Sequence, residues 1–525
     1  MSARRNVLLI TGDQWRWECL SMLGHPCVRT PNLDALAADG ILFRRHFSQA
    51  TPCGPSRASL YTGLYQHNHG VMGNGTPLEH RHTNVALEAR KAGYAPALFG
   101  YTDTAADPRG LAADDPLLRR PSGVLPGMDG VVHMGENFDP WFDHLRQKGY
   151  PVPEPGEKAT DVLAPDPARQ TAGQIASKGR TFAPARFKAE DSSAAFITDG
   201  ALRHIREQNG QSWFVHMSYW SPHPPFIVPE PYNALIDAAD VPHPVRAETP
   251  EAEAALHPWL SYFIFNQMGT NYSVGCPATD NIRISERDWL QLRATYYGMM
   301  AEVDANIGRL VEHLKATGQY DHTLIVFTSD HGEHLGDHWM MAKHSPFEQT
   351  FRVPLIIRDP DTTADGARGD IADDFTENVD IMPTILDWLG RDVPSACDGV
   401  SLGGHLRGQA PVGWRREAHS AFDFRNFLDR GPVSLTGLGP DECRMRFLRG
   451  NRYKYVEFAA WPPLFFDLEA DPGETTNLAD DPLHRERVAG FAERLREKCA
   501  NGAENPLRNT RITSDGVRET VVVAP

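Results

Sequence analysis

The chain has no long apolar run, and it has fewer basic than acidic residues. Residues 7–10 form an apolar stretch that is too short for the core of a secretion signal, and no later stretch is long enough to cross a bilayer. The 52 Lys and Arg residues face 68 Asp and Glu residues, which gives a net charge of −16. This balance argues against nucleic acid and against an anionic membrane as the main partner. We therefore expect a cytoplasmic protein that gathers positive charge only locally.

Cysteine is also scarce and shows no pairing pattern. The seven cysteines are an odd number, are widely scattered and have no C-x-x-C spacing, so they form neither a disulfide framework nor a zinc knuckle. They stand at positions 19, 27, 53, 276, 397, 443 and 499.

One cysteine has a distinctive context. Residues 53–57 read C-G-P-S-R, a C-x-P-S-R pattern followed by a run that can start a helix. A helix from Ala58 would point its N-terminal amides at an anion bound beside Cys53. The ordinary alternative is a buried cysteine before a proline-containing turn, and five residues alone do not decide between the two.

Up to about residue 400, apolar stretches of strand length alternate with stretches of helical period. This alternation predicts an α/β fold with a large, mostly parallel sheet sandwiched by helices. We assign residues 1–410 to the α/β domain, 411–500 to a smaller α+β subdomain with a short antiparallel sheet, and 501–525 to a tail involved in oligomer contact. Residues 104–190 are predicted to be irregular and to cover a site. Expected strands cover 6–11, 41–47, 93–100, 212–220, 322–329 and 353–358, and expected helices cover 31–40, 192–207, 285–317 (with one break) and 379–389.

Acidic residues follow two of the predicted strands directly. Asp13 comes after the first strand, and Asp330 and His331 come after the strand near 322–329. If these strands are neighbours, two carboxylates and an imidazole meet Cys53 at the edge where such sheets place ligands, a set that suits a divalent metal. Either aspartate alone is equally well explained as a helix cap. Two of them together with C-x-P-S-R favour a shared site.

Several motifs together resemble the type I sulfatases, and most closely the phosphonate monoester hydrolase and dimeric arylsulfatase branch of the alkaline phosphatase superfamily. The resemblance extends from about residue 5 to 480. Its motifs are C-x-P-S-R at 53–57, S-P-H-P-P-F at 221–226, S-D-H-G-E at 329–333, Lys343, D-I-M-P-T-I-L at 380–386 and L-F-F-D-L at 464–468.

The resemblance implies that a formylglycine-generating enzyme oxidises Cys53 to formylglycine, whose hydrate is the nucleophile. It also implies one divalent metal ion, with Asp13, Gln14, Asp330, His331 and the modified Cys53 as ligands. Many sulfatases carry Asp and Asn where this chain has Gln14 and His331, and they hold calcium. Because an imidazole suits a transition metal better than calcium, we favour Mn²⁺, with Ca²⁺ or Zn²⁺ as alternatives.

The resemblance assigns roles to five further residues. Arg57, at the end of C-x-P-S-R, would lie on the same helix face as the nucleophile and steady its charged form. Lys343, in apolar surroundings, corresponds to a lysine that bridges nucleophile and substrate oxygens. His223 would contact the leaving-group oxygen or a non-bridging oxygen, although a structural histidine is the ordinary alternative. Asn74 and Tyr101 correspond to polar pocket residues of the phosphonate hydrolases.

Position 103 departs from the phosphonate hydrolases, which have threonine where this chain has Asp103. A carboxylate facing an anionic substrate lowers affinity unless it is protonated, paired or turned away. The sequence therefore predicts a sulfate monoester hydrolase that also accepts phosphonate monoesters and phosphodiesters, and the alternative makes the phosphonate and phosphodiester activity the main one.

Two other classes of function fit less well. A binding protein that kept the fold without the chemistry would have a damaged constellation, and a two-metal phosphatase would need a Ser or Thr nucleophile with a second ligand set. The relatives are dimers or tetramers, so we expect a homo-oligomer that acts on a small anionic ester.

Overall fold

A computed structural model describes residues 5–519 apart from 136, 154–161, 167, 170, 267–280, 426–436, 501–506 and 508–509. Its centre is a sheet of eight strands. They are β1 (Asn6–Gly12), β2 (Ile41–Phe47), β4 (Ala97–Gly100), β5 (Asp129–His133), β6 (Phe214–Tyr219), β7 (Thr323–Thr328), β8 (Leu355–Arg358) and β9 (Ile371–Glu377). Their order in the sheet is β5-β4-β6-β1-β7-β8-β2-β9.

The sheet is mostly parallel, as predicted. β1 lies in the middle with β6 and β7 parallel to it on either side, and β4 continues the parallel set beyond β6. β8 is antiparallel to both of its neighbours, which makes the whole sheet mixed. The parallel core matters for function because the carboxyl ends of β4, β6, β1 and β7 meet at one edge.

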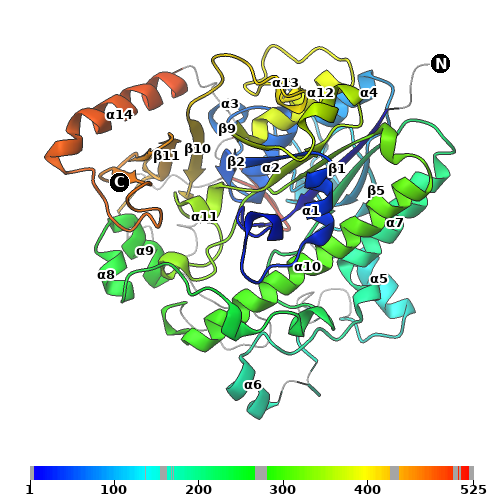
Figure 1. The fold of residues 1–525 in the computed structure, drawn as a ribbon, viewed down its shortest axis with the longest axis horizontal. Helices are drawn as coiled ribbons and strands as arrows, with labels where there is room; N and C mark the ends of the chain where they lie inside the picture. The colour runs from blue at the N-terminus through cyan, green and yellow to red at the C-terminus, as the bar shows by residue number, and fades with distance from the viewer. Residues whose placement is uncertain are drawn as a thin grey trace.

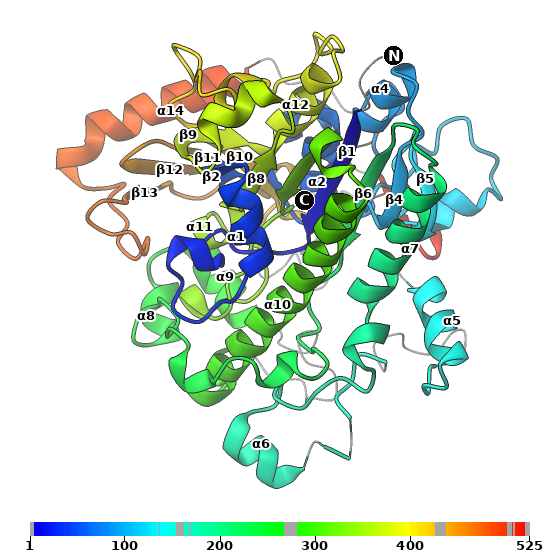
Figure 2. The same cartoon turned by 45° about the vertical axis from the view of Figure 1, so that its right-hand side comes forward.

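Helices cover both faces of this sheet, as Figures 1 and 2 show. The long α10 crosses one face beside α1 and α7, and α2, α4 and α12 lie on the other. The helices are α1 (Pro31–Ala38), α2 (Cys53–Thr62), α3 (Gln66–His69), α4 (Val85–Lys91), α5 (Asp139–Gln147), α6 (Ala172–Lys178), α7 (Ser193–Glu207), α8 (Pro250–Ala254), α9 (Pro258–Asn266), α10 (Glu286–Ala316), α11 (Glu348–Phe351), α12 (Ile381–Trp388), α13 (Gly403–Leu406) and α14 (Arg485–Cys499).

The residues of β1 explain this sandwich. Every residue of β1 is buried, and successive side chains of a strand point to opposite faces. Leu8 and Ile10 pack with residues of α1, α7 and α10, whereas Val7 and Leu9 pack with residues of α2, α4 and α12. Because helices cover both faces of β1, this strand needs a continuous apolar run. The α/β class that such runs predicted is confirmed.

Some predicted elements differ from those in the structure. α2 begins at Cys53 itself rather than at Ala58, because a proline in the first turn, here Pro55, has no intrahelical hydrogen bond to lose. α10 runs without the predicted break. Residues 104–190 contain β5, α5 and α6 instead of only irregular chain. β5 and β9 escaped prediction because β5 is largely exposed and β9 carries several exposed or half-buried polar residues, which leaves little apolar pattern.

A second, five-stranded sheet follows in the C-terminal part. β10 to β13 pair antiparallel in chain order, as expected for the smaller subdomain, and β3 adds parallel to the free edge of β10. α14 packs on one face through Phe491 and Leu495. The boundary at 410 stays a prediction, since β3 comes from the N-terminal part. The strands are β3 (Ala50–Thr51), β10 (Ala418–Asp423), β11 (Arg444–Arg449), β12 (Tyr453–Phe458) and β13 (Leu464–Asp467).

The last described residues form a hairpin of β14 (Thr510–Thr513) and β15 (Gly516–Glu519). The Ile512 N–H donates to the carbonyl of Gly75 at 2.8 Å, so the hairpin contacts the loop that carries Asn74. The expected role of this segment in oligomer contact stays a prediction.

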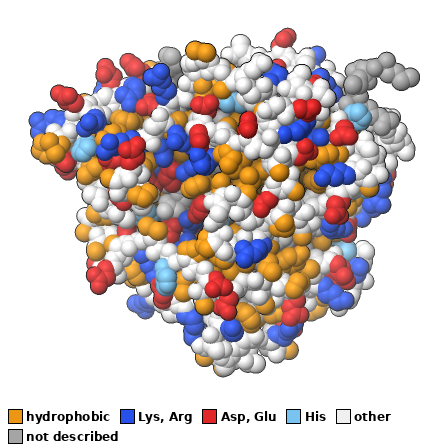
Figure 3. All heavy atoms as spheres, in the orientation of Figure 1, with side chains coloured by type: hydrophobic (Ala, Val, Ile, Leu, Met, Phe, Trp, Pro, Cys, Tyr) orange, Lys and Arg blue, Asp and Glu red, His pale blue; other side chains and the backbone are white. Residues whose placement is uncertain are grey.

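The charged side chains are mixed on the one face that Figure 3 draws, where basic and acidic groups are interspersed. Among the residues that the structure describes, no helix combines the length and apolar character needed to cross a membrane.

Candidate active site

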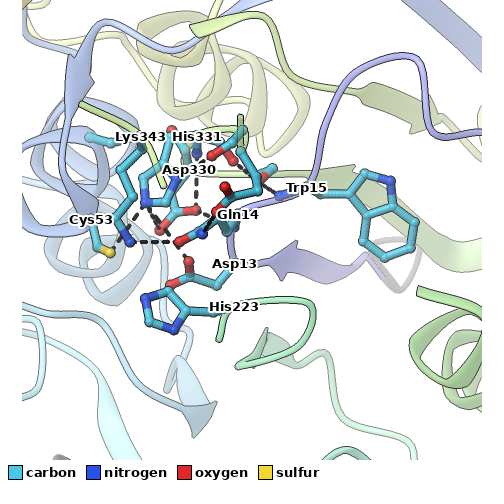
Figure 4. Close-up of polar contacts among 12 residues, drawn as sticks. Asp13, Gln14, Trp15, Cys53, His223, Asp330, His331 and Lys343 are labelled. Atoms are coloured by element: carbon cyan, nitrogen blue, oxygen red, sulfur yellow. Dashed lines mark hydrogen bonds and ion pairs between the residues drawn. The ribbon is translucent and has the colours of Figure 1, made fainter. Parts of the chain in front are cut away.

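Four neighbouring strands deliver the predicted residues to one edge of the sheet. Asp13 follows β1 and Asp330 follows β7, and these strands pair in parallel with Thr11 opposite Thr328. Tyr101 follows β4, and the turn with His223 follows β6. The two aspartates therefore leave adjacent strands, which is the condition on which the predicted shared site depends. Figure 4 shows their side chains converging beside Cys53, at the start of α2.

Asp13, Cys53, Asp330 and His331 form a cluster that can hold a metal ion. One ligand atom from each lies within 4.8 Å of the others, and all four residues are buried. The Cys53 Sγ is 3.2 Å from Nε2 of His331. His331 donates from Nδ1 to the carbonyl of Gly332 at 3.1 Å, so in the neutral ring Nε2 carries the lone pair.

The two carboxylates are oriented for a cation. Asp13 accepts hydrogen bonds at Oδ2 from Nη2 of Arg57, at 3.0 Å, and from the hydroxyl of Tyr101. Its Oδ1 is buried and has no hydrogen-bond partner. Asp330 accepts at Oδ1 from the backbone N–H groups of Gln14 and His331 and at Oδ2 from Arg57. An orphaned buried carboxylate oxygen costs free energy unless something binds it, and a divalent ion fits this position.

The electrostatics of the cluster also favour a cation. Burial, and then the neighbouring Asp330, raise the pKa of Asp13 to about 7. Burial alone would also raise the pKa of Asp330, but His331 and Arg57 hold it below its usual range. Burial lowers the pKa of His331 to about 3, which keeps the imidazole neutral and able to act as a ligand. The raised pKa of Asp13 shows that Arg57 and Lys343 do not fully offset the burial of this carboxylate beside Asp330, so a further cation would stabilise its charged form.

Gln14 lies at the site, but its side chain is engaged by protein groups. Its Oε1 accepts a hydrogen bond from Nζ of Lys343 at 2.7 Å, and its Nε2 donates to Glu333. The backbone of Gln14 is left-handed, with φ 69°, which is uncommon for a residue other than glycine and is typical of functional sites. Its predicted role as a metal ligand stays a prediction.

Arg57 is buried, with every contact made to the protein. Its guanidinium donates to Asp13, to Asp330, to the carbonyl of Tyr101 at 2.9 Å and to Oγ of Ser218 at 2.8 Å. The guanidinium thus holds the carboxylates around Cys53. Its predicted role in steadying the charged nucleophile stays a prediction.

Lys343 and His223 flank the same cluster. Burial alone would lower the pKa of Lys343, but Cys53 and Asp13 raise it, so the ammonium stays charged. His223 donates from Nδ1 to the carbonyl of Pro224 at 2.7 Å, which leaves Nε2 as an acceptor. Burial, and then Lys343, lower the pKa of His223 well below its usual range. Figure 4 shows its ring next to Asp13.

Asn74 and Asp103 lie beside the N-terminus of α2. Oδ1 of Asn74 accepts from the N–H of Gly54 at 2.8 Å, so this side chain positions the turn that carries Cys53. Asp103 is half-buried with a left-handed backbone, φ 49°. Its charge is among the influences that raise the pKa of Cys53, after burial, Asp13 and Asp330.

Three residues that sequence reasoning did not assign also support the site. Glu333 accepts from Gln14 and from the backbone N–H of Ala342 at 2.6 Å, so it fixes the loop that carries the lysine. Tyr296 donates its hydroxyl to the Gln14 carbonyl at 2.6 Å. Ser218 binds Arg57. Glu333 stands inside the S-D-H-G-E motif and could have been found, whereas Ser218 and Tyr296 lie in a strand and a helix without any local signal.

The fold and the site define a hydrolase of the alkaline phosphatase superfamily. The sulfatase family model matches residues 5–391, and the model of the C-terminal part of N-sulphoglucosamine sulphohydrolase matches residues 336–501. The chain belongs to the sulfatase family.

Similar proteins cover nearly the whole chain. A multifunctional alkaline phosphatase superfamily protein, PehA of Trinickia caryophylli, is 40% identical over 98% of this chain and 99% of its own length. The solved phosphonate monoester hydrolase of Agrobacterium radiobacter is 42% identical with a TM-score of 0.89, covering 99% of this chain and 100% of that one. The one from Silicibacter pomeroyi is 39% identical with a TM-score of 0.88, covering 99% of each chain. An arylsulfatase of Clostridium perfringens is more distant, at 26% identity over 92% of each chain.

Proposed function

We propose that this sulfatase-family hydrolase cleaves phosphonate monoesters and phosphodiesters as its main activity and sulfate monoesters as a secondary one, with formylglycine made from Cys53 as nucleophile. The observation that carries the proposal is the cluster of Cys53 with Asp13, Asp330 and His331, because it joins the C-x-P-S-R cysteine to a ligand set for one divalent ion. A hydrated aldehyde at position 53 supplies one hydroxyl for attack and a second whose collapse releases the product.

The residues of the cluster fit a transition metal. Two carboxylates with a neutral imidazole suit Mn²⁺, with Zn²⁺ or Ca²⁺ as the alternatives, and the modified Cys53 would complete the set. When bound, the ion polarises the nucleophile and offsets the charge of the transferring group. The orphaned Oδ1 of Asp13 and the raised pKa of that carboxyl support this assignment.

The protein's own groups would then each have a separate role in catalysis. Arg57 keeps the carboxylates in place, and the N-terminus of α2 favours an anion beside residue 53. Lys343 presents its ammonium to the nucleophile and to a substrate oxygen. His223 is a hydrogen-bond acceptor in the free protein, and an incoming anion raises its pKa, so that Nε2 can donate a proton to the leaving oxygen.

Charge near the nucleophile limits the substrate class. Asp103 acts on Cys53 electrostatically, so a dianion such as a phosphate monoester would meet more repulsion than a monoanion. Sulfate monoesters, phosphonate monoesters and phosphodiesters all carry one negative charge. Asp103 led us to expect a preference for sulfate. The higher identity to two phosphonate monoester hydrolases than to the arylsulfatase supports the phosphonate alternative instead.

The test is a comparison of kcat/KM for four esters of the same leaving group, p-nitrophenol. These are the phenylphosphonate monoester, the phosphodiester, the sulfate and the phosphate monoester. We expect the first two to exceed the sulfate by roughly tenfold or more, about 1.4 kcal/mol in transition-state stabilisation, and the phosphate monoester to be poorest. A higher efficiency for the sulfate would overturn the substrate assignment.

The nucleophile needs a separate measurement. The mass of the tryptic peptide 46–57 distinguishes a thiol at position 53 from an aldehyde and its hydrate. An unmodified thiol in fully active protein from its own host would contradict the formylglycine assignment. Homo-oligomerisation and a cytoplasmic location are part of the proposal, and light scattering and cell fractionation test them.

A further inference from the structure

A second cluster of metal-ligating side chains joins three distant parts of the chain. His67 lies in α3, His419 in β10, and Cys499 is the last residue of α14. One ligand atom from each lies within 4.8 Å of the others, and none of them belongs to the cluster around Cys53. The Cys499 Sγ is 3.8 Å from Nε2 of His419. Their wide separation in the sequence hid this set from any analysis of spacing.

The hydrogen bonds of His419 direct one nitrogen into the cluster. Its Nδ1 lies 3.2 Å from the carbonyl of Phe447, an acceptor, so Nδ1 carries the proton and Nε2 keeps its lone pair. His419 is 1% exposed, and burial lowers its pKa well below the usual range. This arrangement matches that of His331, whose Nδ1 also donates to a backbone carbonyl.

The other two ligands are half-buried and accessible. Burial also lowers the pKa of His67, so both imidazoles are neutral at physiological pH. The ring of His67 stacks on Tyr65, which fixes its plane, and the ring of His419 meets the same tyrosine edge-on. His67 and Cys499 thus line the outer side of the cluster, where an ion can enter from solvent.

Some effects of the charged groups around the cluster favour metal binding and others oppose it. Burial raises the pKa of Cys499, and Arg446 opposes this shift by its positive charge and by a hydrogen bond to the sulfur, which favours the thiolate that metals bind. Arg446 is itself paired with Glu457. Lys498 opposes metal binding by its positive charge, which lowers the pKa of both His67 and His419, and its ammonium lies 4.5 Å from the ring centroid of Tyr65.

We propose that His67, His419 and Cys499 bind a zinc ion that fastens the C-terminal helix to the α/β domain. Zinc–nitrogen bonds of about 2.0 to 2.1 Å and a zinc–sulfur bond of about 2.3 Å at tetrahedral angles place nitrogen and sulfur roughly 3.6 Å apart. The observed 3.8 Å between Nε2 and Sγ is close to this value. The fourth position faces solvent and takes a water molecule. Two imidazoles with one thiolate select zinc over manganese or calcium, which prefer oxygen.

Cobalt(II) is the probe, because it replaces zinc and gives a near-ultraviolet charge-transfer band only when a thiolate binds it. The background is chelator-treated full-length protein carrying Cys53→Ala, which removes the thiol at the active site. We expect cobalt to produce the band in this protein and zinc to abolish it by displacement. The band should be lost in Cys53→Ala/Cys499→Ser and retained in the matched control Cys53→Ala/Cys397→Ser.

Two results would overturn the proposal: no band in the Cys53→Ala protein, or a band that survives Cys499→Ser. Serine is nearly isosteric with cysteine, and circular dichroism of the double variants checks that the fold is kept. His67→Gln provides a second variant at a half-buried position, and it should weaken cobalt binding roughly tenfold or more. Unchanged binding in His67→Gln would remove that histidine from the site.

Discussion

Arg57 donates from Nε to Oδ2 of Asp330 at 2.9 Å, and neither side chain is more than 1% exposed to solvent. The same guanidinium also pairs with Asp13. It therefore links the two carboxylates that follow the central strands β1 and β7. This relationship assigns Arg57 a positioning role for the proposed metal ligands. The C-x-P-S-R motif would therefore carry the proposed nucleophile at one end and the support of the proposed metal site at the other.

Arg57→Lys tests this positioning role. A lysine ammonium is a single point of charge and cannot reach both carboxylates and Ser218 in a fixed geometry. We expect lower metal content, a lower kcat, and destabilisation of roughly 1 to 3 kcal/mol, because the ammonium leaves some of the buried acceptors of the guanidinium without a hydrogen bond. Elemental analysis, steady-state kinetics and thermal melts measure the three effects. Arg44→Lys, at the exposed pair with Asp373, should leave all three nearly unchanged. Normal metal content in Arg57→Lys would contradict the role.

Cys53→Ala should abolish turnover and leave the fold intact. Cys53 is 4% exposed at the first position of α2, where alanine is a good helix former, so the loss of one sulfur should cost only about 1 kcal/mol in unfolding free energy. Turnover of the phosphonate monoester and the thermal midpoint are the measurements. Residual activity near that of the unsubstituted protein would remove Cys53 as nucleophile.

Asp103→Asn should raise kcat/KM for anionic esters. The substitution removes a negative charge beside Cys53, and asparagine tolerates the left-handed backbone that a β-branched threonine would strain. We expect a gain of roughly threefold to tenfold, larger for a dianionic phosphate monoester than for a monoanion, and a weaker dependence on salt. Equal gains for both charges, or none, would mean that Asp103 faces away from the substrate.

The buried carboxyl of Glu302 should make the free energy of unfolding depend on pH, independently of the active site. Burial in α10 raises its pKa to about 7, and its Oε1 has no hydrogen-bond partner. The folded protein therefore binds this proton more tightly than the unfolded chain, so stability falls as pH rises from about 4.5 to about 7. The effect is at most roughly 3 kcal/mol.

Glu302→Gln removes this titration. The difference in thermal midpoint between variant and parent should shift in favour of the variant when the pH is raised from about 5 to about 8. Glu312→Gln, at an exposed position of the same helix, is the control and should show no such shift. A pH-independent difference for Glu302→Gln would mean that the carboxyl is ionised in the folded protein throughout.

The sequence was most informative where one residue property decides the structure. Buried apolar runs such as β1 predicted the parallel core, and acids directly after such runs predicted the positions of Asp13 and Asp330. The partners of Arg57 could not be predicted, because the contacts depend on how four strands align. Ser218 contributes through its place at the end of β6, which only the strand order sets. The half-polar β9 and the exposed β5 were missed because edge strands need little apolar pattern.

The pairing of β3 with β10 bears on how the protein is made. Residues 50 and 51 lie just before Cys53, and they pair with residues 421 and 422, so this segment gains its neighbour only after most of the chain has left the ribosome. Once folded, Cys53 is shielded from solvent. If Cys53 is oxidised as proposed, the maturation enzyme would reach it most readily during translation, before residues 421 and 422 are made. Slower synthesis of the stretch between residues 60 and 420 would then raise the proportion of modified protein.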